Sequence, residues 1–284
     1  MVDINTEILG LIGYPLSHSL SPLLHNHSIK EMGLNYVYLA FPIKEGELEK
    51  AIHGFRAINV RGLNVTIPYK EAVIPLLDEI DSLAKKVGAV NTILNENGVL
   101  KGYNTDVIGL SRMIEEDANF TIKDKKAIIL GAGGAARATG IALLQKGVGE
   151  IHLLNRTISK AKDLAKDWQA YYPDSLIKVN LLDEKIYKEF IAEVDIIIDT
   201  TPVGMSPKHN VEPLIKEKYL NKDILVVDLV YNPQETSLLK AAKRRSAPNI
   251  NGMGMLLYQG IESFKIWTNH EINVSKWREL SMNM

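Results

Sequence analysis

One segment constrains the fold more than any other: residues 126–136, which run KAIILGAGGAA. The apolar run predicts a buried strand, and the residues after the glycines predict the start of a helix. Gly131, Gly133 and Ala136 have the spacing G-x-G-x-x-A, in which the first glycine allows a tight turn and the second lets a pyrophosphate approach the backbone. Amides at a helix N-terminus favour a phosphate there. The segment predicts a dinucleotide-binding unit, with a purely structural turn as the alternative.

The pattern continues after this motif with the alternation of a doubly wound parallel sheet. We expect strands at 127–130, 150–154, 195–199 and 224–230, and helices at 135–145 and 158–171. Short, β-branched apolar runs are typical of parallel strands that are covered on both faces. Residues 106–252 therefore predict a Rossmann domain, in an α/β protein of two αβ domains.

The first part of the chain alternates in the same way. We expect strands at 7–13, 36–41 and 60–65 and helices at 21–32 and 45–54, with Ser21 as the N-cap before Pro22. Residues 89–94 and 99–103 flank Asn95-Glu-Asn-Gly98, which indicates a hairpin. Residues 1–105 therefore predict a mostly parallel sheet with one antiparallel strand. The helical stretches 255–267 and 274–282 come too late to add strands, so residues 253–284 are expected to pack back on this first domain.

Composition limits the partners. The chain has 284 residues, so two domains are expected. A net charge of −1 disfavours a nucleic acid or a membrane as the main partner and favours a small molecule. Cysteine is absent, which excludes disulfides and thiolate metal sites and is typical of the cytoplasm. His18, His25 and His27 have no neighbouring carboxylate, so no metal is expected. No export signal is recognised.

The second strand of the dinucleotide-binding unit ends at Asn155, Arg156 and Thr157. An NAD-binding domain has an acidic residue near this place, which accepts hydrogen bonds from the ribose. A guanidinium instead offers positive charge and a fork of donors to a 2′-phosphate. Arg156 therefore favours NADP, with a solvated surface arginine as the alternative.

Two segments of the first half end in ionisable side chains. NVTIPYK, 64–70, closes a predicted strand on Lys70, and strand ends of open parallel sheets face the ligand. GYNTD, 102–106, places Asp106 at the expected junction of the domains. GAVNT, 88–92, adds the amide of Asn91 at another strand. Each has a simpler alternative: a surface lysine, a helix N-cap and a polar turn.

Nine segments together resemble shikimate dehydrogenase, in the order of that family and over nearly the whole chain. They are GYPLSHSLSP (13–22), NVTIPYK (64–70), GAVNT (88–92), GYNTD (102–106), GAGGAARA (131–138), NRT (155–157), TTPVGM (200–205), DLVYNPQET (228–236) and NGMGMLLYQG (251–260). The resemblance implies reversible NADPH-dependent reduction of 3-dehydroshikimate to shikimate, a step towards chorismate and the aromatic amino acids.

The resemblance also implies roles for individual residues. Lys70 and Asp106 match the catalytic pair. Ser19 and Ser21, with Tyr231, match the side chains that hold the ring carboxylate, while Thr66, Asn91 and Gln259 match those around the ring hydroxyls. The cofactor side is matched by Gly131, Ala132, Gly133, Gly134, Ala135, Asn155, Arg156, Thr157, Lys160, Thr201, Leu229, Gly252 and Met255.

An ammonium beside the reacting oxygen stabilises a developing alkoxide and protonates it, which suits Lys70. Which member of the Lys70/Asp106 pair takes the proton in the reverse direction is left open. Lys160 stands where family members often have arginine, so use of NAD beside NADP is also left open. The alternatives are a quinate/shikimate dehydrogenase with dual cofactor use and a non-catalytic dinucleotide sensor on the same fold. The sequence leaves a homodimer open.

Overall fold

The structure is a computed structural model that describes residues 2–16, 19–207 and 211–282, so Ser17 and His18 lie outside the described residues. The chain divides into two compact units, Met1–Thr105 with Leu257–Met284, and Asp106–Leu256. The second unit ends at Leu256, inside the helix Met253–Thr268, and this is four residues beyond the predicted end of the second domain at 252.

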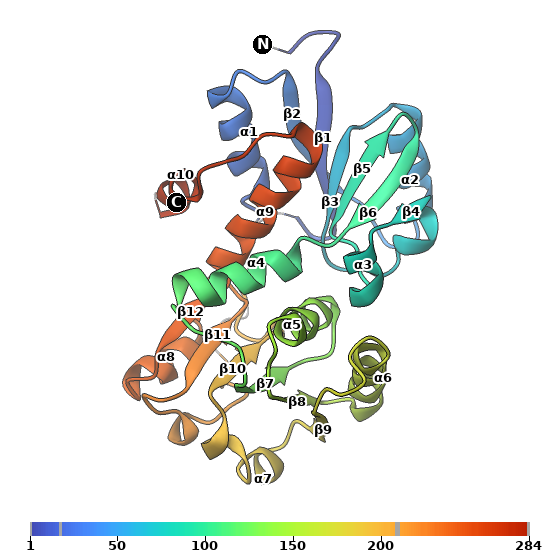
Figure 1. The fold of residues 1–284 in the computed structure, drawn as a ribbon. Helices are drawn as coiled ribbons and strands as arrows, with labels where there is room; N and C mark the ends of the chain where they lie inside the picture. Colours follow the sequence, from blue (N-terminus) through green and yellow to red (C-terminus); the bar gives the residue numbers. More distant parts are fainter. Residues whose placement is uncertain (1, 17–18, 208–210, 283–284) are drawn as a thin grey trace. The chain divides into compact units, whose positions relative to one another are not determined.

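The first unit is built on a six-stranded sheet (Figure 1). Its strands lie in the order β2 (Tyr36–Pro42), β1 (Glu7–Gly13), β3 (Gly62–Val65), β5 (Thr92–Glu96), β6 (Val99–Tyr103) and β4 (Glu79–Ile80). Strand β5 runs antiparallel to both β3 and β6, and all the other pairs are parallel. This confirms the predicted sheet with one antiparallel strand. The hairpin β5–β6 turns at Asn97 and Gly98, which both have the positive φ that a two-residue turn of this kind needs.

The helices of the first unit are α1 (Ser21–Glu31), α2 (Leu48–Ala57), α3 (Ser82–Val87), α10 (Val274–Met282) and the larger part of α9 (Met253–Thr268). Helix α1 starts at Ser21 with Leu20 as its N-cap and no capping side chain, so the predicted N-cap at Ser21 is wrong by one residue. Pro22 still lies in the first turn, where its missing amide hydrogen costs nothing. Helix α9 is fixed to the sheet by the Trp267 indole, whose Nε1 donates to the Ile93 carbonyl at 2.9 Å.

The second unit is built on a parallel sheet of six strands. Their order is β12 (Asn249–Asn251), β11 (Leu225–Asp228), β10 (Ile196–Asp199), β7 (Lys126–Leu130), β8 (Glu150–Asn155) and β9 (Ile177–Leu181). The order reverses between β7 and β10, as in the doubly wound dinucleotide-binding sheet, which confirms the predicted Rossmann fold. The edge strands β9 and β12 were not predicted.

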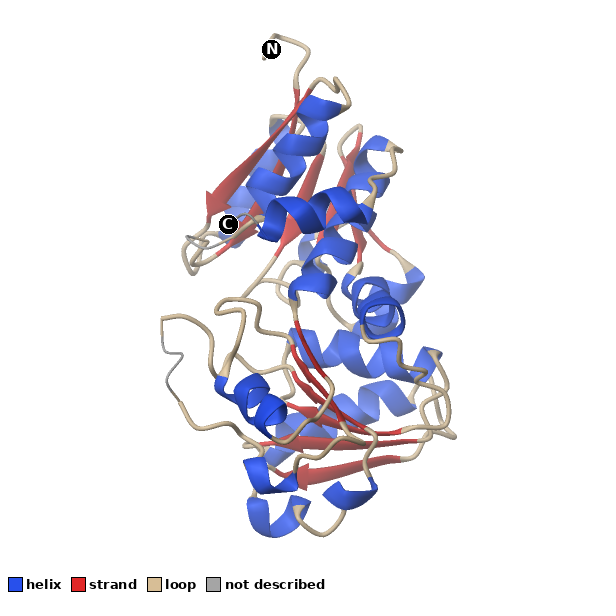
Figure 2. Ribbon diagram, turned by 90° about the vertical axis from the view of Figure 1, so that its left-hand side faces the viewer, coloured by secondary structure: helices blue, strands red, loops and turns tan. Residues whose placement is uncertain are grey.

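The helices of the second unit are α4 (Asp106–Arg112, followed by a π-helical turn at Met113–Asp117), α5 (Gly134–Gln145), α6 (Ile158–Gln169), α7 (Glu184–Tyr187) and α8 (Ser237–Arg244). Helices lie on both faces of the strands, as Figure 2 shows. Neighbouring residues along a strand point to opposite faces of the sheet. Because both faces are covered, two pairs of neighbouring strand residues are fully buried: Ile128 with Ile129, and Ile197 with Ile198. None of the described helices is both long and apolar enough to cross a membrane.

Candidate active site

The loop after β3 carries Thr66 and Lys70 and is held at both ends by backbone bonds. The Thr66 amide donates to the Ile12 carbonyl at 2.9 Å, and the Val90 amide donates to the Lys70 carbonyl at 2.8 Å. Between them the Tyr69 ring is buried, and its hydroxyl donates to the Ile43 carbonyl at 2.8 Å. The side chains of Thr66 and Lys70 are half-buried. The loop therefore fixes Lys70 beside the backbone that leads into Asn91.

Asn91 is buried, and its amide has a defined orientation. Its Oδ1 accepts the Thr105 backbone N–H at 2.8 Å, and a backbone N–H can only donate. The opposite end, Nδ2, donates to Thr105 Oγ1 at 2.9 Å and to Gln259 Oε1 at 3.3 Å. Two predicted substrate residues, Asn91 and Gln259, are thus brought together. The Thr105 backbone fixes the orientation of the Asn91 amide, and Asn91 in turn fixes that of the Gln259 amide.

A buried network of neutral groups supports this pair. Ser263, one turn after Gln259 on α9, lies at the centre of the network and is fully buried. Its hydroxyl is 2.7 Å from Thr92 Oγ1 and 3.2 Å from Thr105 Oγ1, and it accepts from Asn64 Nδ2 at 3.0 Å. Asn64 Oδ1 accepts from the Tyr38 hydroxyl at 2.7 Å. The network therefore connects β2, β3, β5 and α9 within the first unit.

Sequence reasoning missed Asn64, Thr105, Ser263 and Tyr38. Asn64 and Thr105 stand inside quoted motifs, which was the available signal for these two. For Ser263 the signal was its position one helical turn after Gln259.

Ser19 and Ser21 lie at the start of α1. The Ser21 amide donates to Ser19 Oγ at 3.3 Å, so the two residues are joined directly. Ser21 is buried and Ser19 is half-buried. The N-cap residue Leu20 provides no capping side chain, and the first amides of α1 lie at the positive end of the helix dipole, which suits a carboxylate.

Asp106 and Tyr231 belong to the second unit. Asp106 is the first residue of α4 and is buried, while Tyr231 is half-buried in the segment after β11. The pairing of Asp106 with Lys70 and the part of Tyr231 in substrate binding stay predictions.

The glycine turn after β7 has the geometry that the sequence predicts. Gly131 has φ +101°, and a Cβ there would lie 2.8 Å from Thr200 Oγ1, so a side chain is excluded. A Cβ at Gly133 would have no atom within 4 Å, which leaves space for a ligand over the start of α5. No side chain caps α5 at Gly133, so its first amides are available to a pyrophosphate. Ala132, Gly134 and Ala135 complete this turn and are half-buried.

The turn between β8 and α6 presents the groups predicted to bind the 2′-phosphate. Asn155 Nδ2 donates to the Thr157 carbonyl at 2.9 Å and closes the turn. Arg156, Thr157 and Lys160 are exposed. Within the described part of the chain neither Arg156 nor Lys160 is engaged in an ion pair, so both cations can meet a phosphate without losing a partner.

The remaining cofactor residues follow neighbouring strands at the same edge of the sheet. Thr201 follows β10, Leu229 follows β11, and Gly252 and Met255 follow β12. Parallel strands end at one edge, and the ligand binds outside that edge where the strand order reverses. The glycine turn, the cation turn and these residues therefore fit a dinucleotide. Among the described residues no group of three or more histidine and acidic side chains could hold a metal ion.

Comparison with known families decides among the dinucleotide-binding proteins. Residues 11–93 match the shikimate dehydrogenase substrate binding domain, residues 112–239 match shikimate / quinate 5-dehydrogenase, and residues 252–279 match the shikimate 5′-dehydrogenase C-terminal domain. The chain belongs to the shikimate dehydrogenase family.

Individual members of the shikimate dehydrogenase family agree with this assignment. A shikimate dehydrogenase (NADP(+)) of Halothermothrix orenii is 53% identical over 94% of this chain and 93% of its own length. A crystal structure of shikimate dehydrogenase in complex with NADP+ superposes with a TM-score of 0.92 at 44% identity, covering 100% of this chain and 97% of that one. Quinate dehydrogenase of Corynebacterium glutamicum in complex with NAD gives a TM-score of 0.90 at 31% identity, and the match covers 98% of this chain and 99% of that one. The predicted family, the oxidoreductase class and the NADP cofactor are confirmed.

Proposed function

We propose that the chain catalyses the reversible reduction of 3-dehydroshikimate to shikimate with NADPH. The observation that carries this is the cluster at the strand ends of the first unit: one lysine, Lys70, anchored beside a fixed array of amides and hydroxyls around Asn91 and Gln259. A cation beside neutral donors and acceptors suits a carbonyl on a hydroxylated ring, because only the reacting oxygen gains charge.

Each unit takes one ligand in this proposal. Met1–Thr105 with Leu257–Met284 is the substrate domain, and Asp106–Leu256 is the cofactor domain. Bound NADPH supplies the hydride. Lys70 lies at the reacting oxygen, stabilises its developing negative charge and donates the proton, with Asp106 as its partner. The exposed Arg156 grips the 2′-phosphate, with Thr157 and Lys160 beside it.

The remaining substrate contacts follow from charge and position. Ser19 and Ser21 bind the ring carboxylate at the start of α1, and Tyr231 assists them. Thr66, Asn91 and Gln259 bind ring hydroxyls. The carboxylate is thus held by neutral donors and a helix terminus, so the charge of Lys70 is left for the chemical step.

A quinate/shikimate dehydrogenase is the second candidate, favoured by the likeness to a quinate dehydrogenase that was solved with NAD. The test is kcat/KM of the purified chain for four pairs: shikimate or quinate, each with NADP or NAD. The proposal expects the highest value for shikimate with NADP. Equal values for shikimate and quinate favour the second candidate, and no turnover with any pair contradicts both.

We also propose a cytoplasmic location, which the cysteine-free composition supports. A homodimer stays a proposal that measurement of the molar mass in solution tests.

A further inference from the structure

Two acidic residues that have no part in the chemistry above lie side by side in the second unit. Asp199 is the last residue of β10 and Asp228 is the last residue of β11. The two strands are parallel neighbours, and Asp199 and Asp228 are partners in their register. On its other side Asp199 is the register partner of Leu130, which precedes the glycine turn. The acids therefore lie at the edge where we place the cofactor.

Both carboxyl groups hold the turns that follow their strands. Asp199 Oδ1 accepts the Thr201 backbone N–H at 2.8 Å, and Asp228 Oδ1 accepts the Val230 backbone N–H at 2.9 Å. Asp228 Oδ2 accepts from the Thr236 hydroxyl at 2.6 Å. The Thr236 hydroxyl also caps α8 by accepting the Leu239 amide. Thr201 and the Leu229–Tyr231 turn, both in the proposed site, are therefore positioned by these two acids.

The surroundings make two negative charges here costly. Asp199 is 2% exposed and Asp228 is 1% exposed. Within the described chain neither forms an ion pair with a lysine, arginine or histidine. Burial raises the pKa of Asp199 to about 7, and the charge of Asp228 adds to the rise. Burial likewise raises the pKa of Asp228 to about 6. Near neutral pH the pair therefore loses a proton to the solvent as the pH rises and takes it up again as the pH falls.

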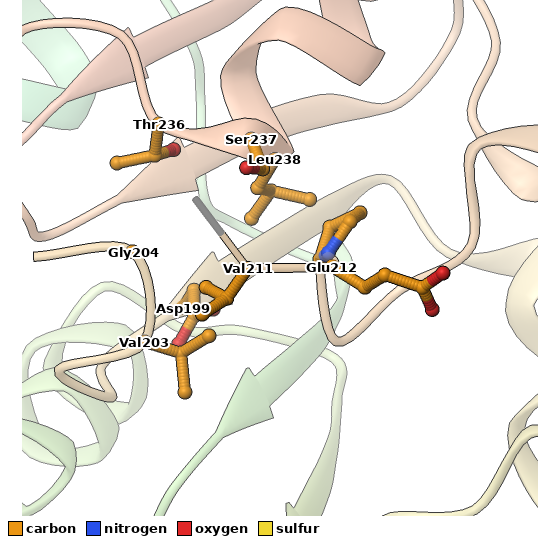
Figure 3. Close-up of a pocket in the computed structure, with 9 residues that line it drawn as sticks. Asp199, Val203, Gly204, Val211, Glu212, Thr236, Ser237 and Leu238 are labelled. Carbon is orange, nitrogen blue, oxygen red and sulfur yellow. The ribbon is translucent and has the colours of Figure 1, made fainter. Parts of the chain in front are cut away.

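A small cavity next to Asp199 shows how little water can compensate for this charge (Figure 3). Its volume is about 10 Å³, and Asp199, Val203, Gly204 and Thr236 are among the residues that line it. This is at the lower limit for one water molecule. Glu212 also lines it, but this carboxylate is exposed and paired with Lys216 at 2.5 Å. The charge that acts on Asp199 is thus that of the other acid, Asp228.

We propose that Asp199 and Asp228 act as one acid pair that positions the NADP-binding turns after β10 and β11 and makes NADP affinity fall as the pair loses its last proton. This inference rests on the proposed function. When one carboxyl is protonated, each turn keeps an oxygen acceptor and the pair carries one negative charge. When both are ionised, the strand ends repel each other and a second negative charge lies at the edge of the sheet where we place the cofactor. Both are positioning residues that act through Thr201 and Leu229.

The test is the Kd of NADP between about pH 5.5 and about pH 8.5 for the wild type, Asp199→Asn and Asp223→Asn. The 2′-phosphate titrates in all three proteins alike, so the difference between profiles is diagnostic. Asparagine keeps the oxygen that accepts from Thr201 and removes the titration. The wild type and the exposed control, Asp223→Asn, should lose about 3- to 10-fold in affinity across neutrality beyond the loss in Asp199→Asn. Parallel profiles overturn the proposal.

A second measurement does not depend on the proposed function. Without cofactor, the Tm of the wild type should fall relative to that of Asp199→Asn as the pH rises from about 5 to about 8, because the folded pair must give up a bound proton. Equal slopes of Tm against pH overturn the acid pair. If NADP fails to bind any of the proteins while these slopes differ, the proposed function fails and the acid pair stands. Should Asp199→Asn not fold, Asp228→Asn serves in both measurements.

Discussion

Both units bury polar residues at strand ends, but the chemistry of these residues differs. In the first unit they are amides and hydroxyls, Asn64, Asn91 and Thr92, joined by hydrogen bonds to one another and to Ser263 of α9. In the second unit they are the carboxyl groups of Asp199 and Asp228. Neutral groups keep one protonation state across the ordinary pH range, whereas the acid pair changes its charge near neutrality. The substrate contacts should therefore be insensitive to pH where the cofactor contacts are sensitive.

Protonation also affects the stability of the two units in opposite directions. His25 in the first unit is fully buried among Tyr38, Phe264, Trp267 and Trp277, and burial lowers its pKa to about 3. The unfolded chain binds a proton on His25 below about pH 6.5 where the folded chain does not, so acid removes stability. The raised pKa of Asp199 has the opposite sign: the folded state holds the proton, and stability is lost as the pH rises from about 4 towards 7.

Removal of the Lys70 ammonium group, which lies beside the neutral cluster, should give the largest effect. Lys70→Ala is expected to lower kcat by about 10²- to 10⁴-fold, because the developing alkoxide loses its proton donor. KM for shikimate and for NADP should change much less. Lys85→Ala, an exposed lysine of α3 in the same unit, is the control. A kcat near that of the wild type would remove Lys70 from the chemical step.

Loss of the neutral carboxylate clamp should affect substrate binding alone. The double variant Ser19→Ala, Ser21→Ala is expected to raise KM for shikimate by at least about 10-fold, because each hydrogen bond to a charged group is worth about 1.5–3 kcal/mol. KM for NADP should stay near its wild-type value. Steady-state kinetics with each substrate varied separately checks this. An unchanged KM for shikimate would place the carboxylate elsewhere.

The matching change in the second unit is Arg156→Ala. KM for NADP should rise by about 10- to 150-fold while KM for NAD changes little, since NAD has no 2′-phosphate. Lys162→Ala, an exposed lysine on α6, should leave the ratio of kcat/KM for NADP and NAD unchanged. If Arg156→Ala also leaves this ratio unchanged, the arginine is only solvated.

The buried His25 of the first unit allows the stability comparison to be tested directly. Between about pH 7 and about pH 5 the wild type should lose about 2 kcal/mol of unfolding free energy more than His25→Phe, at roughly 1.4 kcal/mol for each pH unit below the unfolded pKa. Urea unfolding at both pH values measures this. The exposed His53→Gln variant should behave as the wild type. Equal losses in His25→Phe and the wild type would show that His25 accepts a proton in the folded state.

The smallest effect is expected inside the neutral network. Thr105→Val removes the hydroxyl that accepts from Asn91 Nδ2 but keeps the backbone bond to Asn91 Oδ1. KM for shikimate should rise by about 2- to 12-fold, the cost of one neutral hydrogen bond, and by the same factor at about pH 6 and about pH 8. Thr105→Ser retains the hydroxyl and should restore most of the affinity. A factor that depends on pH would contradict the neutral character of the network.

Local sequence was sufficient to predict the structure where one contiguous segment determines its own conformation. The strand, the glycine turn and α5 form one contiguous segment, so Gly131 and Gly133 were found without tertiary information. Strands β4 and β9 were not found, because a strand of two residues and a half-exposed edge strand lack the apolar run of a central strand.

Tertiary packing created what the sequence did not show. In the sequence Ser263 is one serine among others, and its hydrogen bonds to Asn64 and Thr92 join segments that are distant in sequence. Asp199 and Asp228 end their strands as turn-forming residues commonly do. Their burial and their pairing depend on the order of β10 and β11 in the sheet, which local patterns do not reveal.

The most direct measurement is the consumption of NADPH by the purified chain with 3-dehydroshikimate, followed together with shikimate formation. We predict one shikimate formed for each NADPH oxidised, with catalytic turnover in the wild type and a rate lower by about 10²- to 10⁴-fold in Lys70→Ala. Tight binding of NADPH without its oxidation in the presence of 3-dehydroshikimate would contradict an enzyme built on Lys70 and would identify the chain as a dinucleotide-binding protein without this activity.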